Sequence, residues 1–493
     1  MDVHSTLAPR PAALFGREQA WADLSRFALM PLRGPELGVV YGRRRQGKSF
    51  LLRALTEATG AIYHQGLEEE PARALEAIGH VVARAAGLSA PLALASWDAA
   101  IRALVQQAAG RVIVLDEFPF LAAASPELPS VIQRVFDEAR SGLTPRFRLL
   151  LCGSAMSVMS TLLSGARPLR GRAGLQLLVE PFDFREAAAF WKIRDPETAF
   201  LVHATVGGTP GYRDLLAATP PTKASGFVDW LLTGVLDPSH ALFSEAGYLL
   251  TEDPAISDRA LYQSTLAAIT QGAHTQHEIG GRLGRTDQAM QHPLLVLEKA
   301  GFIRRDPDVL LAKRPVIRTA DTMLRFHHAV VRPDLARFEA RRARDAWPAA
   351  AVRFDTQVLG PHFEDLARDW TLRFASVATL GGRPTAVGFT RINDADRHER
   401  FELDVVALGD PAPGHRRPVI LAIGEAKGGT VPRGMADLAR LDVLRQKLGS
   451  RAVVTTTRLL LFSRGGFSKD LVAAARKRPD VELVDLARLY RGD

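Results

Sequence analysis

Short apolar runs alternate with longer amphipathic stretches along the first third of the chain. The runs occupy residues 37–41, 61–64, 111–116, 147–152 and 175–179. Segments with helical spacing of apolar residues separate most of them, for example at 97–109 and 131–139. Strands that alternate with helices predict an α/β core with a mostly parallel, doubly wound sheet.

The pattern changes further along the chain. Strand signals fade after residue 182 and helical spacing dominates, which predicts a helical lid. A later stretch rich in arginine and alanine predicts a charged helical linker. The expected regions are an α/β core at 1–182, the lid at 183–257, a third region at 258–332, the linker at 333–353 and a C-terminal α/β region at 354–493.

The third region has the pattern of a winged helix-turn-helix. A helix at 261–269 is followed by two more, which Thr275 and Thr286 cap, and the chain enters a short hairpin after Gly301. Three helices and a hairpin predict this motif, although Pro293 falls inside the third helix. The residues expected to face a DNA groove are Arg282, Arg285, Gln288 and Gln291. A module that serves only internal packing is the alternative interpretation.

The C-terminal region alternates between helices and strands. The expected elements are a helix from residue 360, strands near 385–390, 401–408 and 418–423, a helix at 435–448, a strand at 452–456, a helix at 470–477 and a strand at 481–484. This order resembles the core of restriction-endonuclease-like domains, in which an acidic residue precedes an acid-x-lysine triplet on the next strand.

The resemblance implies a group of candidate nuclease residues. They are Asp404, Glu425 and Lys427, with Glu364 as an additional carboxylate. Alternate residues of a strand share a face, so we expect Glu425 and Lys427 to lie together. Clustered carboxylates bind one or two Mg²⁺ ions during phosphodiester cleavage. A degenerate module that is structural or only holds DNA is the alternative.

The strongest chemical signal follows the first apolar run. Eight residues match the phosphate-binding pattern GxxxxGK[ST], between an expected strand and an expected helix. Glycines let backbone N–H groups face phosphate oxygens, and the new helix adds its positive end. Lys48 would reach the β- and γ-phosphates, and Ser49 would ligate Mg²⁺; a plain glycine turn is the alternative. The candidate nucleotide contacts are Gly42, Arg43, Arg44, Arg45, Gln46, Gly47, Lys48, Ser49 and Phe50.

Two carboxylates close the run at 111–116. This run has the near-continuous apolar content of a strand covered on both faces, and it ends in Asp116 and Glu117. Asp116 sits where Mg²⁺ is held through water, and Glu117 where a general base polarises the attacking water. Two acidic residues in an ordinary turn are the alternative. A base in this position favours hydrolysis over binding alone.

The amino-acid composition excludes few classes of protein. The 493 residues are 47% hydrophobic and 24% charged, enough for about three domains. The formal net charge of +9 permits nucleic-acid contact but is modest for this length. One cysteine, Cys152, excludes a disulfide framework within the chain and lies in an apolar run. With no signal-peptide pattern and no apolar run of about 18 residues, we expect a cytoplasmic protein without a membrane partner.

Together these motifs resemble the archaeal-type P-loop ATPases of the STAND class that carry a C-terminal nuclease-like domain. The segments that carry the resemblance are Phe15-Gly16-Arg17-Glu18, Asp116-Glu117-Phe118-Pro119, Cys152-Gly153-Ser154, Pro168-Leu169-Arg170-Gly171-Arg172 and Gly208-Thr209-Pro210. The resemblance implies that Arg17 lies near the adenine, Ser154 near the γ-phosphate and Pro210 of the lid near the nucleotide. It also implies that Arg172 stabilises charge, in cis or toward a neighbouring subunit; a surface ion pair is the alternative.

Three functions follow from these patterns. The first is an ATP-binding and ATP-hydrolysing switch, with ATP and Mg²⁺ as ligands, whose winged-helix and nuclease-like regions act on or hold DNA. The second is a metal-dependent nuclease that ATP licenses, and the third is a non-catalytic DNA-binding regulator. ATP and DNA are the expected partners, and either a homo-oligomer or a regulatory protein partner is left open.

Overall fold

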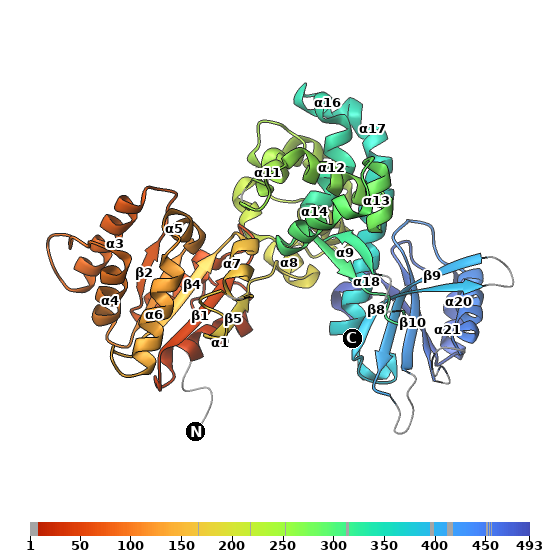
Figure 1. Cartoon of the computed structure of the whole chain (residues 1–493). Coiled ribbons are helices and arrows are strands. Elements are labelled where there is room, and N and C mark those ends of the chain that lie inside the picture. Colours follow the sequence, from red (N-terminus) through yellow and green to blue (C-terminus); the bar gives the residue numbers. More distant parts are fainter. Residues whose placement is uncertain are drawn as a thin grey trace.

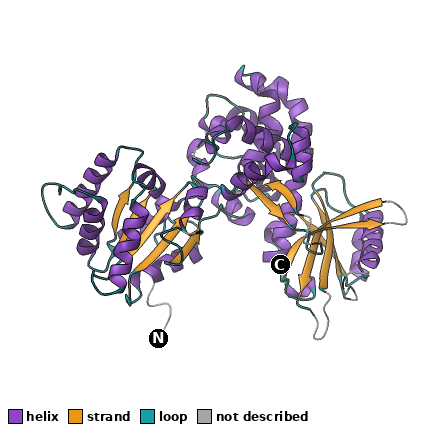
Figure 2. Ribbon diagram, viewed as in Figure 1, coloured by secondary structure: helices purple, strands orange, loops and turns teal. Residues whose placement is uncertain are grey.

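A computed structural model describes residues 8–165, 167–216, 218–251, 253–311, 315–394, 399–411, 418–449, 452, 454 and 456–493. Three parts follow one another along the chain: an α/β core, a mainly helical middle region and a C-terminal α/β region (Figure 1). Figure 2 shows the two large sheets at opposite ends of the molecule, with the helical region between them. No helix among the described residues is both long enough and apolar enough to cross a bilayer.

The core is a doubly wound parallel sheet. Its strands are β1 (Glu36–Tyr41), β2 (Ile62–Gln65), β3 (Val112–Asp116), β4 (Arg148–Gly153) and β5 (Ala173–Leu178). They pair in parallel in the order β2-β3-β4-β1-β5. The predicted parallel sheet is therefore confirmed, and each strand lies within one or two residues of its predicted run.

Helices cover both faces of this sheet. They are α1 (Glu18–Leu29), α2 (Lys48–Thr59), α3 (Pro71–Ala85), α4 (Trp97–Ala108), α5 (Phe118–Ala124), α6 (Leu128–Arg140) and α7 (Met156–Leu162). Alternate residues of β4 enter different apolar clusters: Leu149 and Leu151 pack with α4 and α6, whereas Leu150 and Cys152 pack with α1 and α2. Burial on both faces explains why the strand sequences are continuously apolar.

The first part of the middle region is built from short helices. They are α8 (Phe184–Phe190), α9 (Pro196–Val206), η2 (Pro210–Leu215), η3 (Ala224–Gly226), α10 (Phe227–Trp230), η4 (Leu231–Val235) and α11 (Ala241–Leu249). Asp183 begins α8 with a capping box, in which its side chain accepts from Arg185 N and Glu186 N. The helical pattern expected after residue 182 is present throughout the described residues of this segment.

Three helices and a hairpin follow, in the predicted order. They are α12 (Arg259–Thr270), α13 (Gln276–Arg282), α14 (Asp287–Lys299), β6 (Ile303–Asp306) and β7 (Val316–Thr319). The two strands are antiparallel. Thr275 and Thr286 accept the N-cap hydrogen bonds of α13 and α14, and α14 continues through Pro293.

Helices also occupy the segment expected to be a linker. The elements from this point are α15 (Thr322–Phe326), η5 (His327–Val331), η6 (Arg332–Asp334), α16 (Leu335–Glu339), α17 (Ala343–Arg353) and η7 (Phe354–Leu359). Phe338, Ala346 and Ala350 are fully buried here. The segment is therefore packed against its neighbours rather than extended between two bodies.

The C-terminal region is a mixed five-stranded sheet with helices on both faces. Its elements are α18 (Gly360–Arg373), α19 (Val377–Leu380), β8 (Ala386–Asp394), β9 (Glu399–Gly409), β10 (Val419–Lys427), α20 (Met435–Leu448), β11 (Arg458–Ser463), α21 (Lys469–Lys477), β12 (Val481–Asp485) and α22 (Leu486–Arg491). The strand order is β12-β11-β10-β9-β8. Strands β8, β9 and β10 are antiparallel neighbours, whereas β10, β11 and β12 are parallel.

One predicted strand was wrong. The strand expected at 452–456 is replaced by β11, which begins at Arg458; residues 453 and 455 lie outside the described residues. The buried leucines of β11 pair with β10 on one side and β12 on the other. A leucine-rich run has no strong strand preference, so its long-range pairing decides the structure.

Two packing patterns divide the molecule. One apolar cluster runs from Phe184 of α8 through the middle region to α18 and one face of the C-terminal sheet. The other face of the C-terminal sheet packs against α20 in a separate apolar cluster. The middle and C-terminal regions thus share one apolar cluster, whereas the N-terminal α/β core has two clusters of its own.

Candidate functional site

The candidate nucleotide site lies at the carboxyl edge of the core sheet. The loop 42–47 connects the end of β1 to the first residue of α2, Lys48. Strand β4 lies between β1 and β3, so Ser154 after β4 and Asp116 at the end of β3 meet at the same edge. Ligands of open α/β sheets bind at this edge.

The loop backbone has the curled shape that a phosphate cradle needs. Gly42 and Gly47 have φ values of 154° and 87°, and the non-glycine Arg45 has φ 65°. A Cβ atom on Gly42 would lie 2.3 Å from Val179 O, so a side chain does not fit there. The Lys48 ammonium is buried and donates to Arg43 O at 2.9 Å. The loop is therefore compact, with its lysine folded over it.

The predicted carboxylates lie together at this edge. Asp116 is fully buried; its Oδ2 accepts from the Tyr63 hydroxyl at 2.6 Å and its Oδ1 from Glu117 N at 2.9 Å. Ser154 Oγ donates to Glu117 Oε2 at 3.1 Å. Glu117 has φ 50°, a sparsely populated conformation that is common at functional sites. Burial and the contact with Asp116 raise the pKa of Tyr63.

Arg17 and Pro210 also reach the loop. Arg17 Nη2 donates to Gln46 O at 3.1 Å, and its guanidinium lies 4.5 Å from the Phe182 ring centroid. Burial lowers the pKa of Arg17. Pro210 at the start of η2 lies 4.0 Å from the position of a Cβ atom built on Gly47. The exposed Phe50 and Arg44 lie on the outer side of the same segment.

Arg172 is far from this group. It precedes β5, and β5 pairs with β1 so that Ala173 is opposite Leu37. Arg172 therefore lies beside the amino end of β1, a full strand of roughly 15 Å from the loop. Its guanidinium donates to both carboxylate oxygens of Asp137, at 3.0 and 2.7 Å. This placement does not fit charge stabilisation in cis, and a role toward a neighbouring subunit stays a prediction.

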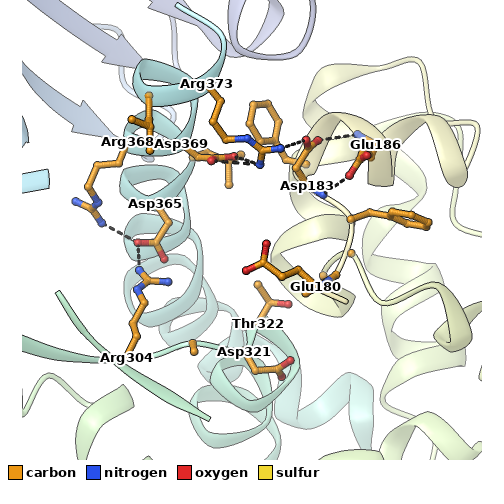
Figure 3. Close-up of a pocket in the computed structure, with 18 of the residues that line it drawn as sticks. Glu180, Asp183, Glu186, Arg304, Asp321, Thr322, Asp365, Arg368, Asp369 and Arg373 are labelled. Carbon is orange, nitrogen blue, oxygen red and sulfur yellow. Dashed lines mark hydrogen bonds and ion pairs between the residues drawn. The ribbon is translucent and has the colours of Figure 1, made fainter. Parts of the chain in front are cut away.

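A cavity of about 1100 Å³ separates the core from the middle and C-terminal regions. Arg17 and Glu180 line its core side, and charged side chains of α18 line the opposite side. Figure 3 shows Asp365, Arg368 and Arg373 on α18, with Arg373 reaching across to Asp183 at 2.9 Å. The cavity thus borders the loop through Arg17, and the Arg373–Asp183 ion pair connects α18 with the start of α8.

The four candidate nuclease residues gather around β9, β10 and α18. Asp404 Oδ2 accepts from Ala426 N at 2.8 Å, between Glu425 and Lys427. Burial raises the pKa of Asp404 and of Glu425, which lies 2.7 Å from Arg440 Nε. Burial and the nearby Asp404 carboxylate raise the pKa of Glu364 to about 7.

Arginines surround these acids. Glu364 lies 3.4 Å from Arg318 of β7 and 3.8 Å from Arg368. Arg318 also lies 3.6 Å from Glu402. Across the part of the chain that the structure describes, no three His, Cys, Asp or Glu side chains converge as a ready metal site. In this conformation the acids are paired with cations of the chain itself.

The candidate DNA-facing residues of the middle region are exposed. Arg285, just before α14, and Gln288 and Gln291 within α14 lie on the surface. Arg282 is also exposed, but it donates to Ala268 O and Gln271 O and so fastens α13 to α12. Arg285 is therefore the better probe of binding.

Three residues near the nucleotide site were not predicted. Tyr63 holds Asp116, Glu245 holds Arg45 and Asp321 holds Arg43. A lone acid inside the apolar helix α11 was the available signal for Glu245. The sequence offers no comparable signal for the other two, because their partners are distant along the chain.

Comparison with known proteins gives limited likenesses. An uncharacterized protein of Methanocaldococcus jannaschii is 24% identical over 380 residues, which cover 76% of this chain and 80% of that protein. No protein-family profile matches the chain.

Several solved structures resemble it in part. A Walker-type ATPase of Pyrococcus abyssi is 17% identical and covers 66% of this chain and 98% of its own, at a TM-score of 0.48. The ORC2 protein of Aeropyrum pernix is 15% identical over 70% of this chain and 96% of its own, with a TM-score of 0.41. A STAND protein with a tetratricopeptide repeat sensor from Pyrococcus horikoshii is 14% identical over 75% and 52%, with a TM-score of 0.29. Because these TM-scores lie below 0.5, the interpretation of the candidate nucleotide site rests on its geometry in this chain.

Proposed function

We propose that this chain binds and hydrolyses ATP as a switch. The observation that carries the proposal is the meeting of Lys48, the acid pair Asp116 and Glu117, and Ser154 at one edge of the sheet. A lysine over a curled glycine loop, beside a buried aspartate and a following glutamate, is the arrangement that triphosphate hydrolysis requires.

Each residue has a distinct task. The loop amides and the amino end of α2 hold phosphate oxygens, and Lys48 exchanges Arg43 O for the β- and γ-phosphates. Glu117, held by Ser154, accepts a proton from the attacking water.

The oxygen donors at this edge suit Mg²⁺. Ser49 and the buried Asp116 are hard ligands of the kind that Mg²⁺ prefers, and they would hold the ion. When bound, the ion neutralises phosphate charge. Tyr63 fixes the orientation of the Asp116 carboxylate through its 2.6 Å hydrogen bond.

ATP turnover by the full chain tests this function. Lys48→Ala should abolish turnover, because the variant lacks the ammonium that would contact the β- and γ-phosphates. Arg73→Ala, which removes an exposed arginine of α3, is the control for the loss of a positive charge and should retain most of the rate. Unchanged turnover in Lys48→Ala would remove the P-loop assignment.

A second candidate function is metal-dependent cleavage of nucleic acid by the C-terminal region, licensed by ATP. It is supported by the grouping of Asp404, Glu425, Lys427 and Glu364 on a nuclease-like order of elements. Incubating DNA with Mg²⁺ or Mn²⁺, with and without ATP, tests it. Cutting that disappears in both Asp404→Ala and Lys427→Ala supports it; absence of cutting under every condition leaves the region as a scaffold.

The middle region suits a DNA-holding role in either function. Its three helices and hairpin have the order of a winged helix-turn-helix, and Arg285, Gln288 and Gln291 are exposed.

We further propose that Arg172 acts toward a neighbouring subunit, if the chain assembles. Mixing Lys48→Ala and Arg172→Ala chains tests this. Turnover is restored only if Arg172 of a Lys48→Ala chain completes the nucleotide site of a neighbouring Arg172→Ala chain.

A further inference from the structure

Two carboxylates outside the α/β core hold two arginines of the phosphate-binding loop. Arg43 Nη1 lies 2.6 Å from Asp321 Oδ2. Arg45 forms a two-point ion pair with Glu245 of α11, at 2.7 and 3.2 Å. The side chains of Asp321 and Glu245 are only 11% and 2% exposed. Pairs so shielded from water are stronger than pairs on an open surface.

The segment η2 also contacts the loop backbone. Gly211 N donates to Arg45 O at 3.0 Å. A Cβ atom on Gly211 would lie 2.7 Å from Arg45 Cβ, which shows how closely η2 approaches the loop. Arg45 has φ 65°, a conformation that a non-glycine residue adopts at a cost. Glu245 binds the side chain of Arg45, and Gly211 N donates to its carbonyl. Together these contacts support the curled conformation of the loop.

Asp321 has a second contact that extends away from the loop. Its Oδ1 accepts from Leu324 N at 2.7 Å and so caps α15. Arg325 of α15 then donates to Asp365 Oδ2 of α18 at 2.8 Å. Both Asp321 and Asp365 line the cavity in Figure 3. A continuous series of contacts thus leads from the loop through α15 to α18, next to Glu364.

We propose that Asp321 and Glu245 are positioning residues of the nucleotide site. They preorganise the phosphate-binding loop through Arg43 and Arg45, so the site is complete only while α11 and α15 are docked on the core. Binding free energies are linked reciprocally. Nucleotide binding therefore stabilises the docked arrangement, and loss of docking weakens nucleotide binding. This inference rests on the proposed ATP binding and names the residues that connect it to the other regions.

Asp321→Asn separates the two contacts of this residue. Asparagine caps a helix about as well as aspartate, so the hydrogen bond to Leu324 N is kept while the charge that holds Arg43 is lost. Asp258→Asn is the matched control, because Asp258 caps α12 in the same way through Leu261 N. Glu245→Gln is the independent second variant, should Asp321→Asn fold poorly.

Calorimetry with ATP and Mg²⁺, together with hydrogen exchange of the full chain with and without ATP, tests the proposal. In the wild type, ATP should slow exchange in α2, α11 and α15. Asp321→Asn should bind ATP about five- to twentyfold more weakly and lose the ATP-dependent protection of α15 while keeping that of α2. Glu245→Gln should do the same for α11, and Asp258→Asn should behave as the wild type.

Three outcomes would overturn the proposal or its basis. Unchanged ATP affinity and unchanged protection of α15 in Asp321→Asn would refute the positioning role. Faster exchange of α15 to the same extent with and without ATP would show a purely structural residue, and would also refute it. No ATP binding by the wild type would instead refute the proposed function, whereas binding without any change in α11 and α15 would refute this inference alone.

Discussion

The nucleotide edge of the core and the carboxylate group of the C-terminal region handle their charges in opposite ways. In the core, Asp116 and Glu117 are held by neutral hydroxyl and amide donors, from Tyr63, Ser154 and the backbone. In the C-terminal region, Glu425 faces Arg440, and Glu364 lies near Arg318 and Arg368.

This difference teaches what each site requires before it can act. Carboxylates held by neutral donors leave oxygen atoms available to a cation or a proton. Carboxylates paired with arginines are already compensated, so a metal ion has to displace or outcompete a guanidinium. The core site is therefore arranged for its ligand, whereas the C-terminal site needs a change of conformation or of protonation first.

The largest effect should come from the core. Glu117→Gln keeps the side-chain shape and its contact with Ser154 but removes the proton acceptor. We expect ATP hydrolysis to fall by about 10²- to 10⁴-fold with ATP binding retained. Single-turnover hydrolysis and calorimetry measure the two quantities separately. Rapid hydrolysis by this variant would contradict the assignment of the base.

The pH dependence of Glu364 sharpens the contrast. Its pKa is raised to about 7 from an ordinary 4.5, so the folded chain binds this proton more tightly than the unfolded chain does. The stability that this group contributes is therefore lost as pH rises from about 4.5 to 7. Glu364→Gln should remove that loss.

Thermal unfolding from pH 5 to pH 8 measures this effect. The stability of Glu364→Gln relative to the wild type should rise by about 2 kcal/mol across the range, a figure reduced for the partial exposure of the side chain. Glu339→Gln, at an exposed position of α16, controls for the general loss of a carboxylate. A difference that does not vary with pH would show that Glu364 has an ordinary pKa.

Replacing Arg440, the partner of Glu425, tests directly whether arginines compete with a metal ion for these carboxylates. Arg440→Ala should increase Mn²⁺ affinity about three- to tenfold, since the half-exposed pair is worth roughly 1 kcal/mol. The measurement belongs at alkaline pH, because burial raises the pKa of Glu425. Arg476→Ala, at the last turn of α21, is the control. Equal Mn²⁺ binding by all three proteins would mean that the arginine does not compete with metal.

The smallest effect concerns nucleic acid. Arg285→Ala should weaken DNA binding a few-fold at all sequences and lower the salt dependence by about one ion, as expected for one lost phosphate contact. Titrations at several salt concentrations measure this slope. Arg305→Ala on β6 is a control, because Arg305 pairs with Glu298 at 2.9 Å. Binding that is indifferent to Arg285 would remove this surface from consideration.

Local patterns predicted most of the architecture. The core strands have continuous apolar runs, and Thr275 and Thr286 have strong capping chemistry, so both were found within a residue or two. The strand at 452–456 was misplaced because β11 is defined by its pairing with β10 and β12. Spacing along the chain does not encode such pairing.

The candidate sites show the same limit. The loop and Asp116 follow from a contiguous motif in a strand–loop–helix context. Arg172 was associated with the nucleotide by a motif, but the direction of β5 carries it to the far edge of the sheet. Asp321, 278 positions after Arg43, meets the loop only through folding. Contacts of that kind come from tertiary structure alone.

The central claim is that the loop amides and Lys48 bind a nucleoside triphosphate. Calorimetric titration of the pure full chain with ATP and Mg²⁺ tests it most directly. The account predicts saturable, Mg²⁺-dependent heat for the wild type and its loss in Lys48→Ala. No heat with ATP, or identical titrations for the two proteins, would contradict it.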